Sequence, residues 1–92
     1  MGIVSLSGHL ICANQSEADA VVELLPEHIR LTRQEPGCLS FQVTPAQDPW
    51  TWIVAERFTD AQAFEAHQQR VSSSHWGQGT AGIKREYRIE GL

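Results

Sequence analysis

Two histidines and a tryptophan in the second half of the chain carry the side chains best suited to acid–base chemistry at neutral pH. His67 follows Phe64 at helical spacing, and His75 and Trp76 precede a glycine-rich stretch. An imidazole titrates at about pH 6.5, so it can accept a proton at neutral pH. An indole offers a broad apolar wall and one N–H donor. These residues predict one pocket, with His67 and His75 as candidate catalytic bases and Trp76 as a substrate contact.

Each histidine also has a structural interpretation. His67 could be a helix residue bonded to a backbone carbonyl, and for His75 a structural position at the rim stays open. His9 shares a strand face with serines, where packing or a hydrogen bond across a dimer is expected. His28 falls on the polar side of the first predicted helix, so we expect it to be solvated.

A lone carboxylate lies among apolar side chains in the middle of the chain. Glu56 shares a strand face with Trp52 and Phe58, so we expect it to be at least partly buried. A buried carboxylate must be paired or protonated. Arg85 and Tyr87 lie on the apolar face of the last strand and could pair with it, or these groups could orient a substrate. Arg85, Tyr87 and Trp52 are therefore candidate substrate contacts, although core or interface packing is the alternative for the indole.

Metal and cofactor signatures are absent from the sequence. It contains no H-E-x-x-H, G-x-G-x-x-G, P-loop or G-x-S-x-G motif. Cys12 and Cys38 are too isolated for a zinc site or a disulfide framework, and we expect buried thiols. We therefore predict that the purified protein is colourless and carries no metal and no cofactor.

Composition and charge restrict the class of protein. The chain has 92 residues, of which 41% are hydrophobic and 20% charged, as in a single globular domain over 1–92. A net charge of −4 argues against binding to nucleic acid or to an anionic membrane surface. No apolar run approaches the ~18 residues of a membrane span, and the first 12 residues do not resemble a signal peptide. We therefore expect a cytoplasmic protein.

The candidate residues must be positioned by four strands and two main helices. Apolar side chains alternate in the predicted strands and recur every three or four residues in the predicted helices. The apolar stripe of the first helix consists of Ala18, Val21, Val22, Leu25 and Ile29. Ser16 with Asp19 resembles a capping box before the first helix, and Thr59-Asp60 caps the second. A short further turn or helix runs through Trp76. The predicted strands span 3–12, 38–44, 50–58 and 83–90, and the predicted helices span 17–34 and the segment from the Thr59-Asp60 cap to Arg70.

The order β-α-β-β-α-β is the ferredoxin-like plan of an α+β protein, an antiparallel sheet with helices on one face. The second face of such a sheet usually meets water and is polar. Here both faces of the segment 50–58 carry apolar side chains, and Ile3 and Ile11 add to the second face. The chain is too short to supply a third layer. We therefore expect a homodimer that pairs sheet to sheet.

Several short segments resemble the antibiotic biosynthesis monooxygenase family. The segment RQEPGCLSF at 33–41 resembles that family's R-x-E-P-G-C-L-x-Y/F motif. The segment ERF at 56–58 is similar to its E-x-W/F, FEAH at 64–67 to its A-H helix, and SHW at 74–76 to its S-x-H-F. The first motif is the specific one, and the order and spacing of the others support it over nearly the whole chain.

The resemblance implies a dimeric α+β barrel in which two ferredoxin-like units join by their sheets. It also implies a cofactor-independent monooxygenase that uses dioxygen on a quinol, a phenol or a polyketide-like aromatic. One alternative is a non-catalytic barrel that binds a small hydrophobic ligand. Another is a haem-binding or haem-degrading relative. That branch uses an asparagine on the first strand, where this chain has Ser7 and His9.

Overall fold

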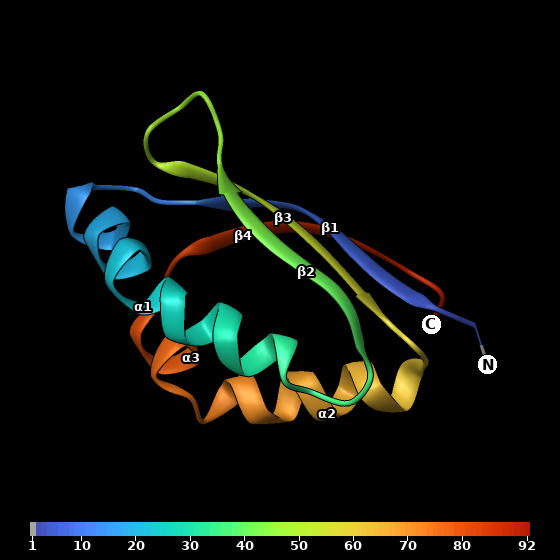
Figure 1. The fold of residues 1–92 in the computed structure, drawn as a ribbon. Helices are drawn as coiled ribbons and strands as arrows, with labels where there is room; N and C mark the ends of the chain where they lie inside the picture. Colours follow the sequence, from blue (N-terminus) through green and yellow to red (C-terminus); the bar gives the residue numbers. More distant parts are fainter. Residues whose placement is uncertain (1) are drawn as a thin grey trace.

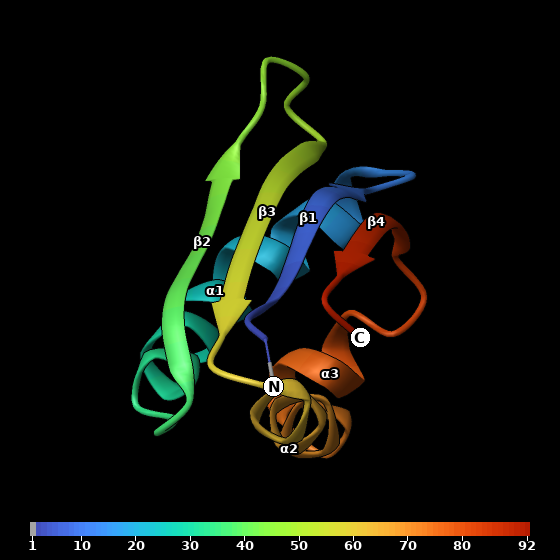
Figure 2. The ribbon, with the colours of Figure 1, turned by 90° about the vertical axis from the view of Figure 1, so that its right-hand side faces the viewer.

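Four strands form one antiparallel sheet and three helices lie along one of its faces in the computed structural model, which describes residues 2–92 (Figure 1). Figure 2 shows the strands side by side in the order β2-β3-β1-β4. The predicted α+β, ferredoxin-like plan is confirmed, with α3 as a short third helix. The elements are β1 Val4–Ile11, α1 Gln15–Arg33, β2 Cys38–Pro45, β3 Thr51–Phe58, α2 Ala61–Ser72, α3 His75–Gly79 and β4 Lys84–Glu90.

The register of the sheet brings the central part of three strands together beneath the helices. Leu6 on β1 pairs with Glu56 on β3, and Gly8 pairs with Val54 on one side and Tyr87 on the other. Gly8 has a φ of 151°, and a Cβ there would overlap the carbonyl oxygen of Glu86. Because only glycine leaves this space, β4 can approach β1 and hold Tyr87 beside the centre of the sheet.

The start of α1 differs from the predicted capping box. Asn14 is the N-cap, and its side chain accepts a hydrogen bond from the backbone N–H of Glu17. The Glu17 carboxylate in turn accepts from the backbone N–H of Ala13 at 2.7 Å. The prediction of Ser16 with Asp19 was therefore two residues late, because Asn14 and Glu17 have the same three-residue spacing and the better acceptors.

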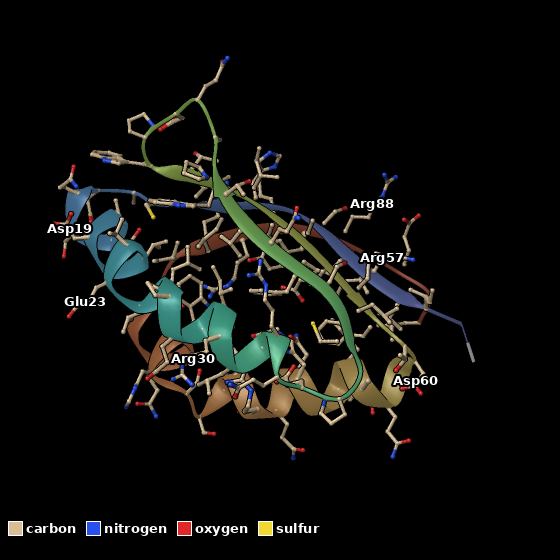
Figure 3. All side chains as sticks on the ribbon, viewed as in Figure 1. Asp19, Glu23, Arg30, Arg57, Asp60 and Arg88 are labelled. Atoms are coloured by element: carbon tan, nitrogen blue, oxygen red, sulfur yellow. The ribbon has the colours of Figure 1, made fainter. Side chains whose placement is uncertain are left out.

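The hydrophobic core fills the layer between sheet and helices. In Figure 3 the labelled Asp19, Glu23 and Arg30 of α1 point away from the sheet, while side chains from both layers fill the interior. Part of α1 departs from the predicted apolar stripe, because Val22 is 64% exposed. The most deeply buried apolar side chains come from β1, α1, β2 and β3, and they are Val4, Leu10, Val21, Phe41 and Phe58.

The opposite face of the sheet carries no helix (Figures 1 and 2). Ile53 lies there on the central strand β3 and is 44% exposed, and Ile3 is also exposed. Leu39 and Phe41 alternate in the sequence as if they shared one strand face, but a register shift between Cys38 and Ser40 leaves Leu39 exposed while Phe41 is buried. None of the helices within residues 2–92 is long and apolar enough to cross a membrane.

Candidate functional site

A cavity of about 360 Å³ lies between the covered face of the sheet and the three helices. The apolar part of its sheet side includes Leu6, Val43 and Val54. Its helix side carries His28 from α1, His67 from α2 and Trp76 from α3, and three further polar groups come from the sheet, Glu56, Arg85 and Tyr87. A volume of this size suits a small aromatic molecule, and the few polar groups would fix its orientation.

Four of the six candidate residues from the sequence line this cavity: His67, Trp76, Arg85 and Tyr87. Trp52 does not line it and is buried in the hydrophobic core. It therefore has the packing role that the sequence analysis weighed as the alternative.

His75 also lies outside the cavity. It is the first residue of α3, its side chain is 77% exposed, and its Nδ1 donates a hydrogen bond to Glu27 Oε1 at 2.9 Å. The next residue, Trp76, turns inward and is buried. A helix presents successive residues about 100° apart, so the two neighbours cannot both face the interior. The structure therefore does not bring the two histidines into one pocket.

A carboxylate fixes the ring of His67 through Nδ1, the ring nitrogen that points away from Glu56. The ring is 2% exposed, and its Nδ1 lies 2.8 Å from Glu35 Oε1. Arg70 donates to the other oxygen of Glu35 at 2.5 Å and to Thr32 Oγ1 at 3.1 Å. Because a carboxylate paired with an arginine accepts and does not donate, Nδ1 carries the proton. The other ring nitrogen, Nε2, is left with a free lone pair.

That free nitrogen faces Glu56. The distance from His67 Nε2 to Glu56 Oε1 is 3.7 Å, too long for a hydrogen bond, and Oε1 finds no partner among the described residues. Pairing of Glu56 with Arg85 or Tyr87 was expected, and this was wrong for Arg85. The guanidinium of Arg85 donates instead to the carbonyl oxygen of Thr80 at 2.7 Å and to its hydroxyl at 2.9 Å.

The surroundings push the two facing groups toward their neutral forms. Burial raises the pKa of Glu56 to about 7, and the charge of Glu35 adds to this rise. Burial lowers the pKa of His67, although Glu35 opposes the change. Burial also raises the pKa of Tyr87 to about 12. At neutral pH the cavity therefore holds a neutral imidazole, a neutral phenol and a carboxyl group close to its titration point.

His28 was expected to be solvated, but it is 5% exposed and lies over the cavity. Its ring stacks on Trp76 with a centroid distance of 4.6 Å and an interplanar angle of 3°. Burial lowers its pKa to about 3, so the ring is neutral. The buried positions Val21, His28 and Thr32 follow helical spacing. That spacing was the available signal for His28, and the predicted stripe through Val22 missed it.

Glu35 was missed as a site residue because it was interpreted only as part of the turn that ends the first helix. It does lie at that turn, just beyond α1, but its side chain reaches back to α2. Within residues 2–92 there is no group of three or more His, Cys, Asp or Glu side chains arranged to hold a metal ion.

Comparisons with known proteins agree with this fold. The model of the family described as antibiotic biosynthesis monooxygenase matches residues 11–78. No curated protein matches the sequence. Similar solved structures include Rv0793 from Mycobacterium tuberculosis, with 20% identity, a TM-score of 0.78 and coverage of 99% of this chain and 95% of that one. PA3566 from Pseudomonas aeruginosa has 23% identity, a TM-score of 0.71 and coverage of 100% and 93%.

A third structure, of a protein named as an antibiotic biosynthesis monooxygenase, has 22% identity, a TM-score of 0.72 and coverage of 94% of this chain and 92% of that one. At these identities the solved structures support the fold, whereas the family match covers most of the sequence and includes Glu35, Glu56, His67 and Trp76. This chain belongs to the antibiotic biosynthesis monooxygenase family.

Proposed function

We propose that this protein is a monooxygenase that needs no cofactor and acts with dioxygen on a phenol, a quinol or a polyketide-like aromatic bound in the cavity. The observation that carries the proposal is the free Nε2 of His67, which lines the cavity while Glu35, held by Arg70, fixes the other ring nitrogen. A neutral imidazole in such a place can take a phenolic proton and create an electron-rich phenolate. A bound aromatic ring that displaces water from the cavity would keep the phenolate reactive.

The proposed reaction needs no external reductant. The phenolate gives one electron to dioxygen, the two radicals join at a ring carbon that bears hydrogen, and a peroxide anion forms there. Loss of the carbon-bound proton and cleavage of the O–O bond leave a quinone carbonyl and one water. A phenol with one open para position thus consumes one dioxygen and yields one quinone and one water. The protein supplies the base, the orientation and the exclusion of bulk water.

The other lining residues would orient the aromatic ring. Trp76, supported by the stacked His28, offers a flat apolar wall. Tyr87 offers a hydroxyl that stays protonated at neutral pH, since its pKa is raised to about 12. Arg85 lines the cavity while its guanidinium holds the Thr80 backbone, so it also fixes the segment that precedes β4.

Oxygen consumption tests the proposal. Purified protein, treated with a chelator, is mixed with a panel of quinols, anthrones and naphthols, and dioxygen uptake is followed with an electrode. We expect uptake above the uncatalysed rate for at least one compound, and mass spectrometry with isotopically labelled dioxygen should find one labelled oxygen in the quinone. Tight binding of these compounds without uptake would instead support a non-catalytic ligand-binding barrel.

We further propose that the uncovered face of the sheet pairs with a second copy of the chain. The support is the exposed Ile53 at the centre of a sheet face that no helix covers. Light scattering should give about twice the chain mass. We expect Ile53→Asp to shift the protein to the monomer mass, because pairing would bury one unpaired charge from each chain. Val22→Asp is the matched control, since Val22 is exposed on α1. A wild-type monomer would contradict the proposal.

A further inference from the structure

Among residues 2–92, Glu56 is the one carboxyl group that lines the cavity, and the proposed oxygenation as described above assigns it no role. Its side chain is 8% exposed, one oxygen has no hydrogen-bond partner among the described residues, and the facing atom is His67 Nε2 at 3.7 Å. A buried polar atom without a partner is rare in a folded protein and marks a place where strain, catalysis or a ligand must account for it. Here the group lines a cavity, which points to the ligand.

We propose that Glu56 is a second catalytic residue, which in its protonated form donates a proton to the oxygen derived from dioxygen while His67 accepts the proton of the phenol. This inference rests on the proposed function. It goes further because it divides the proton transfers between two named groups and requires a substrate that contacts both an acceptor nitrogen and a donor carboxyl group.

The geometry suits this division. His67 has its proton on Nδ1, toward Glu35, and its lone pair on the cavity side. A substrate hydroxyl placed at Nε2 therefore meets an acceptor, and the neighbouring carboxyl group supplies the nearest acidic proton. The gap of 3.7 Å between the two groups leaves neither engaged by the other, so both are free for a bound molecule. Pairs of groups whose surroundings push them toward different protonation tasks are typical of acid–base enzymes.

The charges around Glu56 come from every layer that packs against it. Glu35 lies beyond His67 and raises the cost of a second negative charge, while Arg70 is held by Glu35 and Thr32. Arg85 is held by Thr80 and does not bond Glu56. The titratable or charged groups that surround Glu56 are His28 on α1, Glu35 after α1, Cys38 on β2, His67 and Arg70 on α2, and Arg85 and Tyr87 on β4.

The proton count closes over one turnover. His67 takes the phenolic proton, and the phenolate reduces dioxygen and forms a peroxide anion on the ring. Glu56 gives its proton to the outer peroxide oxygen, which makes a hydroperoxide. The Glu56 carboxylate then takes the ring C–H proton as the O–O bond breaks, and the leaving hydroxide receives the proton from His67. The products are a quinone and water, and both residues return to their starting forms.

The pH profile of turnover tests the role of Glu56. In the wild-type protein the acid form is lost above about pH 7, so we expect kcat to fall there. Glu56→Gln keeps the shape and a donor but no transferable proton, and we expect kcat about 10²- to 10⁴-fold lower with little change in KM. Glu56→Asp retains a titrating group and should keep part of the turnover together with the alkaline decline. Glu65→Gln on the exposed side of α2 is the matched control and should behave as wild type.

The outcomes separate the two proposals. If Glu56→Gln retains the wild-type kcat and the same fall of kcat at alkaline pH, the role of Glu56 is overturned, whereas the proposed oxygenation is unaffected. Absence of turnover by the wild-type protein on every compound of the panel overturns both. A thermal melt of each variant shows whether it is folded. Should Glu56→Gln fail to fold, Glu56→Asp is the deciding variant. If Glu56→Asp turns over at the wild-type rate and its kcat no longer falls at alkaline pH, the role of Glu56 as proton donor is overturned.

Discussion

His67→Ala is expected to lower turnover of a phenolic substrate by about 10²- to 10⁴-fold, the range lost when a general base is removed. The reason is geometric: Glu35 fixes the ring with Nε2 unprotonated, and that nitrogen lines the cavity. The substitution leaves the Glu35–Arg70 ion pair in place, so α2 keeps its anchor to the end of α1. We expect the loss in kcat to exceed any change in KM.

Steady-state oxygen uptake measures this effect, and two further variants make it specific. Gln69→Ala changes an exposed residue of the same helix and should leave kcat unchanged. His75→Ala removes the other histidine that the sequence singled out, and its exposed position predicts turnover close to that of wild type. Turnover by His67→Ala at the parental rate would contradict a base at this position and would leave catalysis to orientation and desolvation.

The arrangement of the strands could be predicted from the sequence because the side chains of each strand alternate between more and less covered positions. Val4, Leu6 and Leu10 alternate with polar or exposed residues, and Trp52, Val54 and Phe58 do the same. Because side chains alternate between the two faces of a strand with a period of two, the apolar residues can be assigned to only one face of the sheet. Four such strands separated by two helices can be connected in only a few topologies. The face on which Leu39 lies could not be predicted in this way. The register shift beside Cys38 interrupts the alternation of side chains along β2, and the sequence pattern does not reveal such a shift.

The candidate site was harder to predict because its central contact joins residues far apart in the chain. Glu35 and His67 are 32 positions apart, and they meet only because the end of α1 packs beside α2. Glu35 lies in a Pro-Gly turn, so its type and position already had a structural explanation. The burial of Glu56 was predictable from strand alternation, but its facing partner was not, since that partner comes from a helix and not from β4.

A further expected result concerns stability, because Glu56 makes the folded state sensitive to pH. Its folded pKa of about 7 lies above the ordinary value of 4.5, so the folded protein holds this proton more tightly than the unfolded chain. The stabilisation is fully present below about pH 4.5 and is lost as the pH rises toward about 7. The gap between the two pKa values corresponds to about 3 kcal/mol. Glu56→Gln should therefore gain stability relative to wild type as the pH rises.

The contribution of His28 to stability depends on pH in the opposite direction, so it must be separated from the effect of Glu56. Its folded pKa of about 3 lies below the ordinary 6.5, so its contribution is present above about pH 6.5 and is lost as the pH falls toward about 3. Both proteins contain His28, so its contribution cancels when Glu56→Gln is compared with wild type by urea unfolding. The difference in unfolding free energy should grow by about 3 kcal/mol between about pH 4 and about pH 8. Glu65→Gln, an exposed carboxylate on α2, should show no such growth. A difference that stays constant for Glu56→Gln would mean that water reaches Glu56 in the folded protein, and the neutral carboxyl group on which the proton donation depends would be lost.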